Sequence, residues 1–117
     1  MDDKSALANF ALIETTYCLV GHSHTPLIFV ELDEKSVDLY VPQYRSPLHL
    51  DGPRLIINPG SVGQPRDYDP RAAYALLDSD QMTLEHRRVF YPVTEVQERM
   101  ADHELPMRLI TRLQFGW

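Results

Sequence analysis

A run of β-branched, aromatic and apolar residues extends from Thr15 to Val20 and stops abruptly at Gly21. Such a run is typical of a buried strand, so we predict a strand at residues 15–20. His22 and His24 follow directly after the glycine, which lets the chain turn sharply. In open α/β sheets, ligands bind beyond the carboxyl ends of the strands. The sequence therefore predicts two imidazole side chains at a ligand-binding edge of a sheet.

In the rest of the chain, short strand-like segments alternate with proline- and glycine-rich segments that are typical of turns and loops. Further strands are predicted at residues 27–32, 36–41, 54–58, 71–78 and 82–90. The first two form a hairpin around residues 33–35, and the last two are joined by a turn at Ser79-Asp80. Residues 42–53 and 61–70 are predicted to be loops.

Apolar spacing predicts helices near both ends of the chain. The first covers residues 3–14 and is capped by Asp2 or Asp3. The second covers residues 94–104, with Thr94 and Gln97 at capping-box spacing. A last short helix begins at Pro106 and buries Leu109, Ile110 and Leu113. One helix, a run of strands and two helices make an α+β arrangement by local order, or the second half of a layered α/β one.

Composition limits the class of protein. The chain has 117 residues, which is one domain at most, and its 44% hydrophobic and 24% charged residues indicate a globular protein. A net charge of −6 opposes non-specific binding to nucleic acid. No apolar stretch reaches the roughly 18 residues of a membrane span.

The single cysteine, Cys18, rules out an intrachain disulfide and is predicted to be a buried thiol. This cysteine usage suits a reducing compartment. The chain begins Met1-Asp2-Asp3, which lacks the basic start of a signal peptide. We therefore expect a cytoplasmic protein.

The chemistry of the histidine pair points to a metal, because imidazole suits zinc, manganese, iron or nickel. The pair alone is too small a ligand set. A catalytic zinc takes about three protein ligands, and two metals about 3.5–4 Å apart take more. In such a centre, His22 and His24 would serve one metal each. The alternative is two ordinary polar residues on a turn, and a bare His-x-His motif favours that alternative.

A second small-residue loop, Asn58 to Gly63, also follows a predicted strand. Its backbone N–H groups can face an oxyanion, although a tight turn stabilised by Asn58 and Ser61 is the simpler interpretation. Arg66 lies just beyond this loop and can contact a phosphate or pair with Asp67 or Asp69.

The other three histidines are separate from both loops. His49 lies in a proline-flanked loop, His86 lies in a predicted strand, and His103 ends a predicted helix. We interpret all three as structural or solvent-facing.

Taken in order, residues 20–26, 57–67 and 69–78 resemble calcineurin-like metallophosphoesterases, most closely the small bacterial and archaeal phosphodiesterases. The resemblance implies that residues 1–117 are a single partial domain, the C-terminal portion of a four-layer α/β/β/α sandwich. It also implies two divalent metal ions (Mn, Fe, Ni or Zn), with His22 binding one and His24 the other. Asn58, Gly60 and Ser61 would shape the cavity. The substrate of a longer parent protein would be a phosphoester small molecule or a nucleotide.

The chain departs from this family in what it lacks. The family's N-terminal motifs are Asp-x-His, Gly-Asp-x-x-Asp and Gly-Asn-His-Asp/Glu. None of the five glycines is followed by Asp or Asn, and no histidine has an aspartate two residues before it. The family loop often has glycine where this chain has Tyr68. We therefore expect activity in the parent protein, and weak or absent metal binding and no turnover in this chain alone.

Two functions follow from these features. The chain is either a fragment of an active metal-dependent phosphoesterase or a non-catalytic protein-binding or scaffold module on the same fold. An upstream reading frame that encodes the missing motifs would favour the first. Half a sandwich leaves strand edges and apolar surface uncovered, so we also predict a homo-oligomer.

Overall fold

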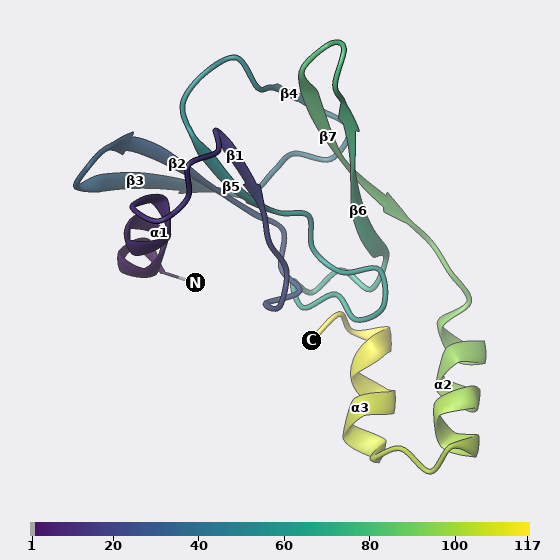
Figure 1. The fold of residues 1–117 in the computed structure, drawn as a ribbon. Coiled ribbons are helices and arrows are strands. Elements are labelled where there is room, and N and C mark those ends of the chain that lie inside the picture. Colours follow the sequence, from purple (N-terminus) through teal and green to yellow (C-terminus); the bar gives the residue numbers. More distant parts are fainter. Residues whose placement is uncertain (1) are drawn as a thin grey trace.

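The computed structural model describes residues 2–117, which form two β-sheets and several short helices (Figure 1). The first sheet has the order β1-β5-β2-β3, with β1 at Tyr17–Leu19, β5 at Leu55–Asn58, β2 at Leu27–Asp33 and β3 at Ser36–Tyr40. The second has the order β4-β7-β6, with β4 at Pro47–His49, β7 at Thr83–Val89 and β6 at Ala72–Asp78. Strands β1 and β5 are parallel, and the other pairs are antiparallel.

Most of the predicted strands are confirmed within one or two residues. The turn between β2 and β3 is fixed by Asp33, whose Oδ1 accepts a hydrogen bond from the N–H of Lys35 at 2.8 Å. Strand β4 was missed because it lies within the proline-rich segment 42–53, which was predicted to be a loop. Pro47 begins this strand at the edge of the second sheet, where a missing N–H is tolerated.

Strand β1 differs from its prediction in both length and burial. It spans three residues, and Leu19 is 63% exposed, whereas a buried strand was expected over residues 15–20. Cys18 is only partly buried, so the predicted buried thiol is also wrong. The reason is topological, because β1 pairs with β5 on one side and is the edge of the sheet on the other.

The first helix, α1, covers Asp3–Phe10 and begins as predicted, with Asp2 Oδ1 accepting from the N–H of Ser5 at 2.8 Å. It ends four residues earlier than expected. Ala6 and Phe10 are buried against the first sheet, whereas Leu12 is 82% exposed. Because the residues after Phe10 have little core to pack on, the chain turns there toward β1.

Helices α2 (Val93–Asp102) and α3 (Met107–Thr111) form a hairpin, and a 3-10 turn at Arg112–Gln114 follows. The predicted capping box is wrong, because the Nε2 of Gln97 donates instead to the carbonyl of Ile110 at 2.8 Å. Ile110 and Leu113 are buried as predicted, and Leu109 is half-buried. Among residues 2–117, no helix combines the length and apolar character needed to cross a bilayer.

The core has two parts, one on each face of the first sheet. Side chains between the two sheets include Ile28, Leu55, Ile57 and Leu84. Side chains between the first sheet and α1 are Ala6, Phe10, Phe29 and Ile56. Strand β5 contributes to both parts, and all four of its residues are buried. The layers are therefore helix, sheet and sheet, which confirms the mixed α and β arrangement predicted for part of a layered sandwich.

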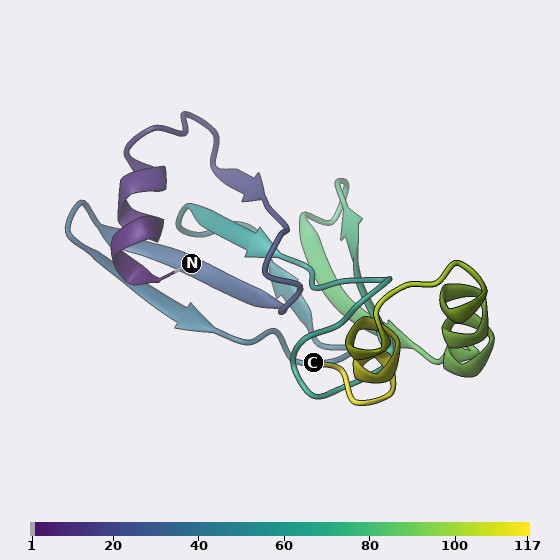
Figure 2. The same ribbon diagram turned by 90° about the horizontal axis from the view of Figure 1, so that it is seen from below.

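The molecule is elongated. Its axes measure 48, 30 and 20 Å, and its radius of gyration is 16.2 Å. A closed domain of this length has a radius of gyration of about 13 Å. Figure 2 shows α2 and α3 beyond the end of the second sheet, while α1 covers one part of the first.

Candidate functional site

The segment that links β1 to β2 carries both predicted metal ligands. His22 and His24 have φ angles of 74° and 61°, in the left-handed region that residues other than glycine seldom adopt. Each such residue costs on the order of 1–3 kcal/mol, and such strain concentrates at functional sites. Two strained histidines within three residues indicate a loop whose shape is imposed by its surroundings.

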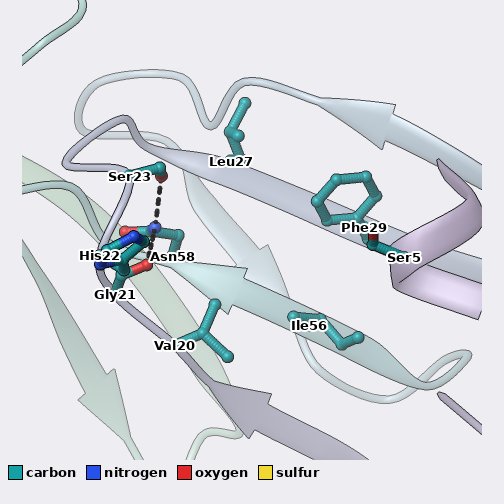
Figure 3. A pocket seen from close by; sticks show the side chains of 9 residues that line it. All are labelled: Ser5, Val20, Gly21, His22, Ser23, Leu27, Phe29, Ile56 and Asn58. Atoms are coloured by element: carbon teal, nitrogen blue, oxygen red, sulfur yellow. Dashed lines mark hydrogen bonds between the residues drawn. The ribbon is translucent and has the colours of Figure 1, made fainter. Parts of the chain in front are cut away.

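Asn58 is the main residue that imposes this shape. It ends β5, is buried, and donates from Nδ2 to the carbonyl of Gly21 at 3.0 Å and to Ser23 Oγ at 2.9 Å (Figure 3). Its Oδ1 accepts from the N–H of Gly60 at 2.9 Å. Because β1 and β5 are parallel, their carboxyl ends meet at one edge of the sheet. The structure thus brings the histidine loop and the Asn58 loop together.

The orientation of His24 is fixed by the second loop. Its Nδ1 lies 2.8 Å from the carbonyl oxygen of Gln64, and a carbonyl can only accept a hydrogen bond. Nδ1 therefore donates the hydrogen bond, and the neutral tautomer that does so has its lone pair on Nε2. Metal-binding histidines commonly have this arrangement, since the outer hydrogen bond sets the tautomer and the ring plane. His24 is half-buried, whereas His22 is exposed.

The Gly60–Ser61 turn requires glycine. Gly60 has a φ of +93°, and a Cβ there would lie 2.8 Å from the Cβ of Ala73 and 3.0 Å from Pro26 Cγ. Ser61 Oγ accepts from the N–H groups of Gly63 at 3.3 Å and Gln64 at 3.0 Å. These N–H groups are therefore satisfied within the loop, which favours the tight-turn interpretation over an oxyanion cradle.

Arg66 is exposed and lies next to the histidine loop. Its backbone N–H donates to the carbonyl of His24 at 3.2 Å, and its Nη2 donates to Gln64 Oε1 at 2.9 Å. Within residues 2–117 it pairs with neither Asp67 nor Asp69. Its guanidinium group therefore faces solvent beside the loop that carries His24.

Asp67 and Asp69 bind other arginines. Arg88 forms an ion pair with Asp67, and Arg71 makes a bidentate contact with Asp69, at 2.9 Å from Nε to Oδ1. The hydrogen bonds from Arg71 lower the pKa of Asp69. The pairing of these two carboxylates with Arg66, which the sequence left open, therefore does not occur in the described part of the chain.

His86 is a buried polar residue, and the sequence did not distinguish a buried position from a solvent-facing one. Only 3% of its surface is exposed, and within residues 2–117 neither ring nitrogen has a hydrogen-bond partner. Burial, followed by the charge of Arg88, lowers its pKa. The alternation of Leu84, His86 and Arg88 along β7 is the signal that places it inward. His49 and His103 are exposed, as predicted.

A cavity of about 270 Å³ opens beside the histidine loop (Figure 3). His22, Ser23 and Asn58 line the end next to the loop, and Ser5 and apolar side chains including Val20 and Ile56 line the rest. Within residues 2–117, His, Cys, Asp and Glu side chains form no group of three or more that would hold a metal ion. The described residues therefore offer two imidazoles here, which are fewer ligands than a complete metal centre takes.

Comparison with known proteins identifies the fold. No family model matches the chain. An uncharacterized protein of Methanocaldococcus jannaschii is 38% identical over 98 residues, which are 83% of this chain and 38% of that protein. The crystal structure of a metallophosphoesterase from Sphaerobacter thermophilus matches with 39% identity and a TM-score of 0.93, over 100% of this chain and 49% of that one. The chain has the fold of part of a metallophosphoesterase.

The match confirms the resemblance and the fold class predicted from the sequence. The chain spans about half the length of the solved metallophosphoesterase and less of the archaeal protein. The roles of individual metallophosphoesterase residues, and the treatment of residues 1–117 as one partial domain, stay predictions.

Proposed function

We propose that this chain supplies one wall of the dinuclear metal centre of a metal-dependent phosphodiesterase. His22 and His24 would each bind one metal, and carboxylates from protein outside these 117 residues would complete both ligand sets. The 39% identity to a metallophosphoesterase over the whole chain supports the reaction class. The observation that carries the proposal is the strained histidine loop, in which the bond from His24 Nδ1 to Gln64 leaves Nε2 for a metal.

The chain's own residues would hold the histidine loop and orient the metal-binding rings. Asn58 fixes the loop that carries the histidines, and Gln64 fixes the ring of His24. A dinuclear centre supplies Lewis-acid and nucleophile activation to phosphoester hydrolysis. Mn, Fe, Ni and Zn are all compatible with imidazole ligands.

The proposed substrate is a small phosphodiester or a nucleotide. The chain is acidic overall, so the attraction for a phosphate would come from bound cations and from Arg66. Arg66 suits this role because its side chain is exposed while its backbone is bonded to His24.

The test uses a chimera in which this chain replaces the matched half of the Sphaerobacter thermophilus metallophosphoesterase. Hydrolysis of bis(p-nitrophenyl) phosphate with Mn²⁺ should occur in the chimera and fall at least a hundredfold on His22→Ala or His24→Ala. His49→Ala and His103→Ala, at exposed positions, are the matched controls. Turnover by the 117-residue chain alone that His22→Ala abolishes would contradict the proposal. A folded chimera with neither metal binding nor turnover would support the scaffold alternative.

A further inference from the structure

The loop between β5 and β6 connects the histidine loop to the C-terminal segment of the described chain. On one side, the N–H of Arg66 donates to the carbonyl of His24 at 3.2 Å. On the other side, the N–H of Tyr68 donates to the carbonyl of Gly116 at 2.9 Å. Figure 1 shows the end marked C beside the loops that follow β1 and β5. Residues 115–117 therefore lie at the same end of the molecule as the candidate metal site.

The backbone of residues 115–117 is held in place by close contacts. Gly116 is buried and has a φ of +68°, and a Cβ there would lie 2.7 Å from the backbone nitrogen of Asp69. The N–H groups of Phe115 and Gly116 each donate to the carbonyl of Arg112 at 3.1 Å. The close approach of two backbones therefore fixes the positions of Phe115 and Trp117 beside the loop.

Three aromatic side chains around this contact are exposed, and we call Tyr68, Phe115 and Trp117 the aromatic cluster. Phe115 and Trp117 are 45% and 53% exposed, and their ring centroids are 5.3 Å apart with an angle of 35° between the rings. Tyr68 is 85% exposed, although its backbone is held at a φ of 65°. Neighbouring aromatic side chains that stay in solvent mark an interaction surface.

The aromatic cluster fits a ligand that has both a flat ring and a phosphate. Exposed aromatic side chains stack on nucleobases, and the stacking tolerates any base because each base has a π face. Arg66 supplies the positive charge, because it is exposed and lies two residues before Tyr68. Two residues span at most about 7 Å, which is the scale of the ribose that joins a base to its phosphate. An apolar peptide would also cover the rings, but it would bring no anion to Arg66.

We propose that the aromatic cluster binds a nucleobase, and that the substrate is therefore a phosphodiester with a nucleoside on one side. This inference rests on the proposed function, because the metals and Arg66 hold the phosphate while the cluster holds the base. The cluster takes no part in bond breaking. It positions the substrate and favours esters that carry a base over esters that lack one.

Trp117 is the one tryptophan among the 117 residues, so its fluorescence reports on the aromatic cluster directly. Titration of the full chain with adenosine 5′-monophosphate should quench this fluorescence with saturation. Ribose 5-phosphate carries the same phosphate without the base, and it should not quench the fluorescence. Quenching by neither ligand, or equal quenching by both, would overturn the proposal.

Variants of the cluster locate the bound base. Tyr68→Ala and Phe115→Ala should each raise the dissociation constant of adenosine 5′-monophosphate at least about fivefold, which corresponds to the loss of one stacked ring. Tyr68→Phe keeps the ring and should bind as the wild type does. Leu32→Ala is the matched control, because Leu32 is 62% exposed on the β2–β3 hairpin, and it should have no effect. Binding that Tyr68→Ala and Phe115→Ala leave unchanged would place the base elsewhere and contradict the proposal.

The chimera with the Sphaerobacter thermophilus half separates base binding from hydrolysis. Thymidine 5′-(p-nitrophenyl phosphate) and methyl p-nitrophenyl phosphate share a leaving group, and only the first carries a base. Tyr68→Ala and Trp117→Leu should each lower the ratio of the two kcat/KM values at least about fivefold. Hydrolysis of both esters with a ratio that neither variant changes would overturn the base site and leave the proposed function intact. A chimera that hydrolyses neither ester, while adenosine 5′-monophosphate still quenches Trp117, would contradict the proposed function and support the base site.

Discussion

Strands β1 and β5 are parallel neighbours that end at the same edge, yet they have opposite environments. All four residues of β5 are buried, because it lies between β1 and β2 and packs on both faces. Strand β1 has three residues and one open side, with Leu19 63% exposed. Strand β5 therefore belongs to the core of the described chain, whereas β1 lies at the open edge of the first sheet.

The largest effect is expected where the two strands are in direct register, at Leu19 and Ile57. Ile57 is 1% exposed in the core between the sheets, so Ile57→Ala should lower the free energy of unfolding by about 2–5 kcal/mol. Leu19→Ala should change it by less than about 0.5 kcal/mol. Urea unfolding of both variants measures the difference. Equal losses would contradict the assignment of β1 to an open surface.

Asn58 should have the next largest effect, because it fastens the end of β5 to the loop after β1. Asn58→Ala removes two donated hydrogen bonds and one accepted one at a buried position, which should cost about 2–3 kcal/mol. The control is Asn9→Ala, because Asn9 makes one exposed hydrogen bond within α1 and should cost less than about 1 kcal/mol. If thermal unfolding gave similar losses for the two variants, the proposed anchoring role of Asn58 would be wrong.

The buried histidine should make the core sensitive to pH. Burial lowers the pKa of His86 below the unfolded value of 6.5, so the unfolded chain binds more protons than the folded chain in acid. Stability from His86 is therefore present at neutral pH and is lost as the pH falls below about 6.5. His86→Leu should flatten this dependence between pH 5 and 7, whereas His103→Gln, at an exposed position, should leave it unchanged. Urea unfolding between pH 5 and 7 measures the change in the free energy of unfolding with pH. If His86→Leu changed with pH as much as the wild type does, the proposed effect of His86 would be wrong.

The smallest effect concerns strain in the loop that supports His24. Tyr68 has a φ of 65° and is 85% exposed, and the family often has glycine at this position. Relieving a left-handed residue gains about 1–2 kcal/mol, and the added backbone entropy of glycine removes about half of that. Tyr68→Gly should therefore stabilise the chain by up to about 1 kcal/mol, and Tyr68→Ala, which keeps the strain, should not. Thermal unfolding that shows no gain for glycine over alanine would contradict this.

Sequence patterns that act over a few residues predicted much of the fold. The β2–β3 and β6–β7 hairpins, the Asp2 cap and the burial of Ile110 follow from turn chemistry and apolar spacing, which act over a few residues. The exposure of β1 did not follow, because an apolar run does not reveal whether a strand has neighbours on one side or two. Strand β4 was missed because its pairing with β7 is long-range and its sequence contains proline.

The candidate site was also predicted only in part from the sequence. The sequence predicted that the His22–His24 and Asn58–Ser61 loops each follow a strand. It did not predict that the loops meet, because the pairing of β1 with β5 joins residues far apart in the chain. The bond between His24 and the carbonyl of Gln64 was not predicted either, because backbone carbonyls carry no sequence signal. The environment of His86 depends on Arg88, Asp67 and Asp69, which lie on a strand and a distant loop.

The metal stoichiometry of the chimera with the Sphaerobacter thermophilus half shows whether this chain forms one wall of a dinuclear centre. Elemental analysis after equilibration with Mn²⁺ should give two ions per folded chimera. The double variant His22→Ala with His24→Ala should hold fewer than two, while His49→Ala should keep both. Two tightly held ions in the double variant would show that these histidines are not metal ligands and would contradict the proposed function.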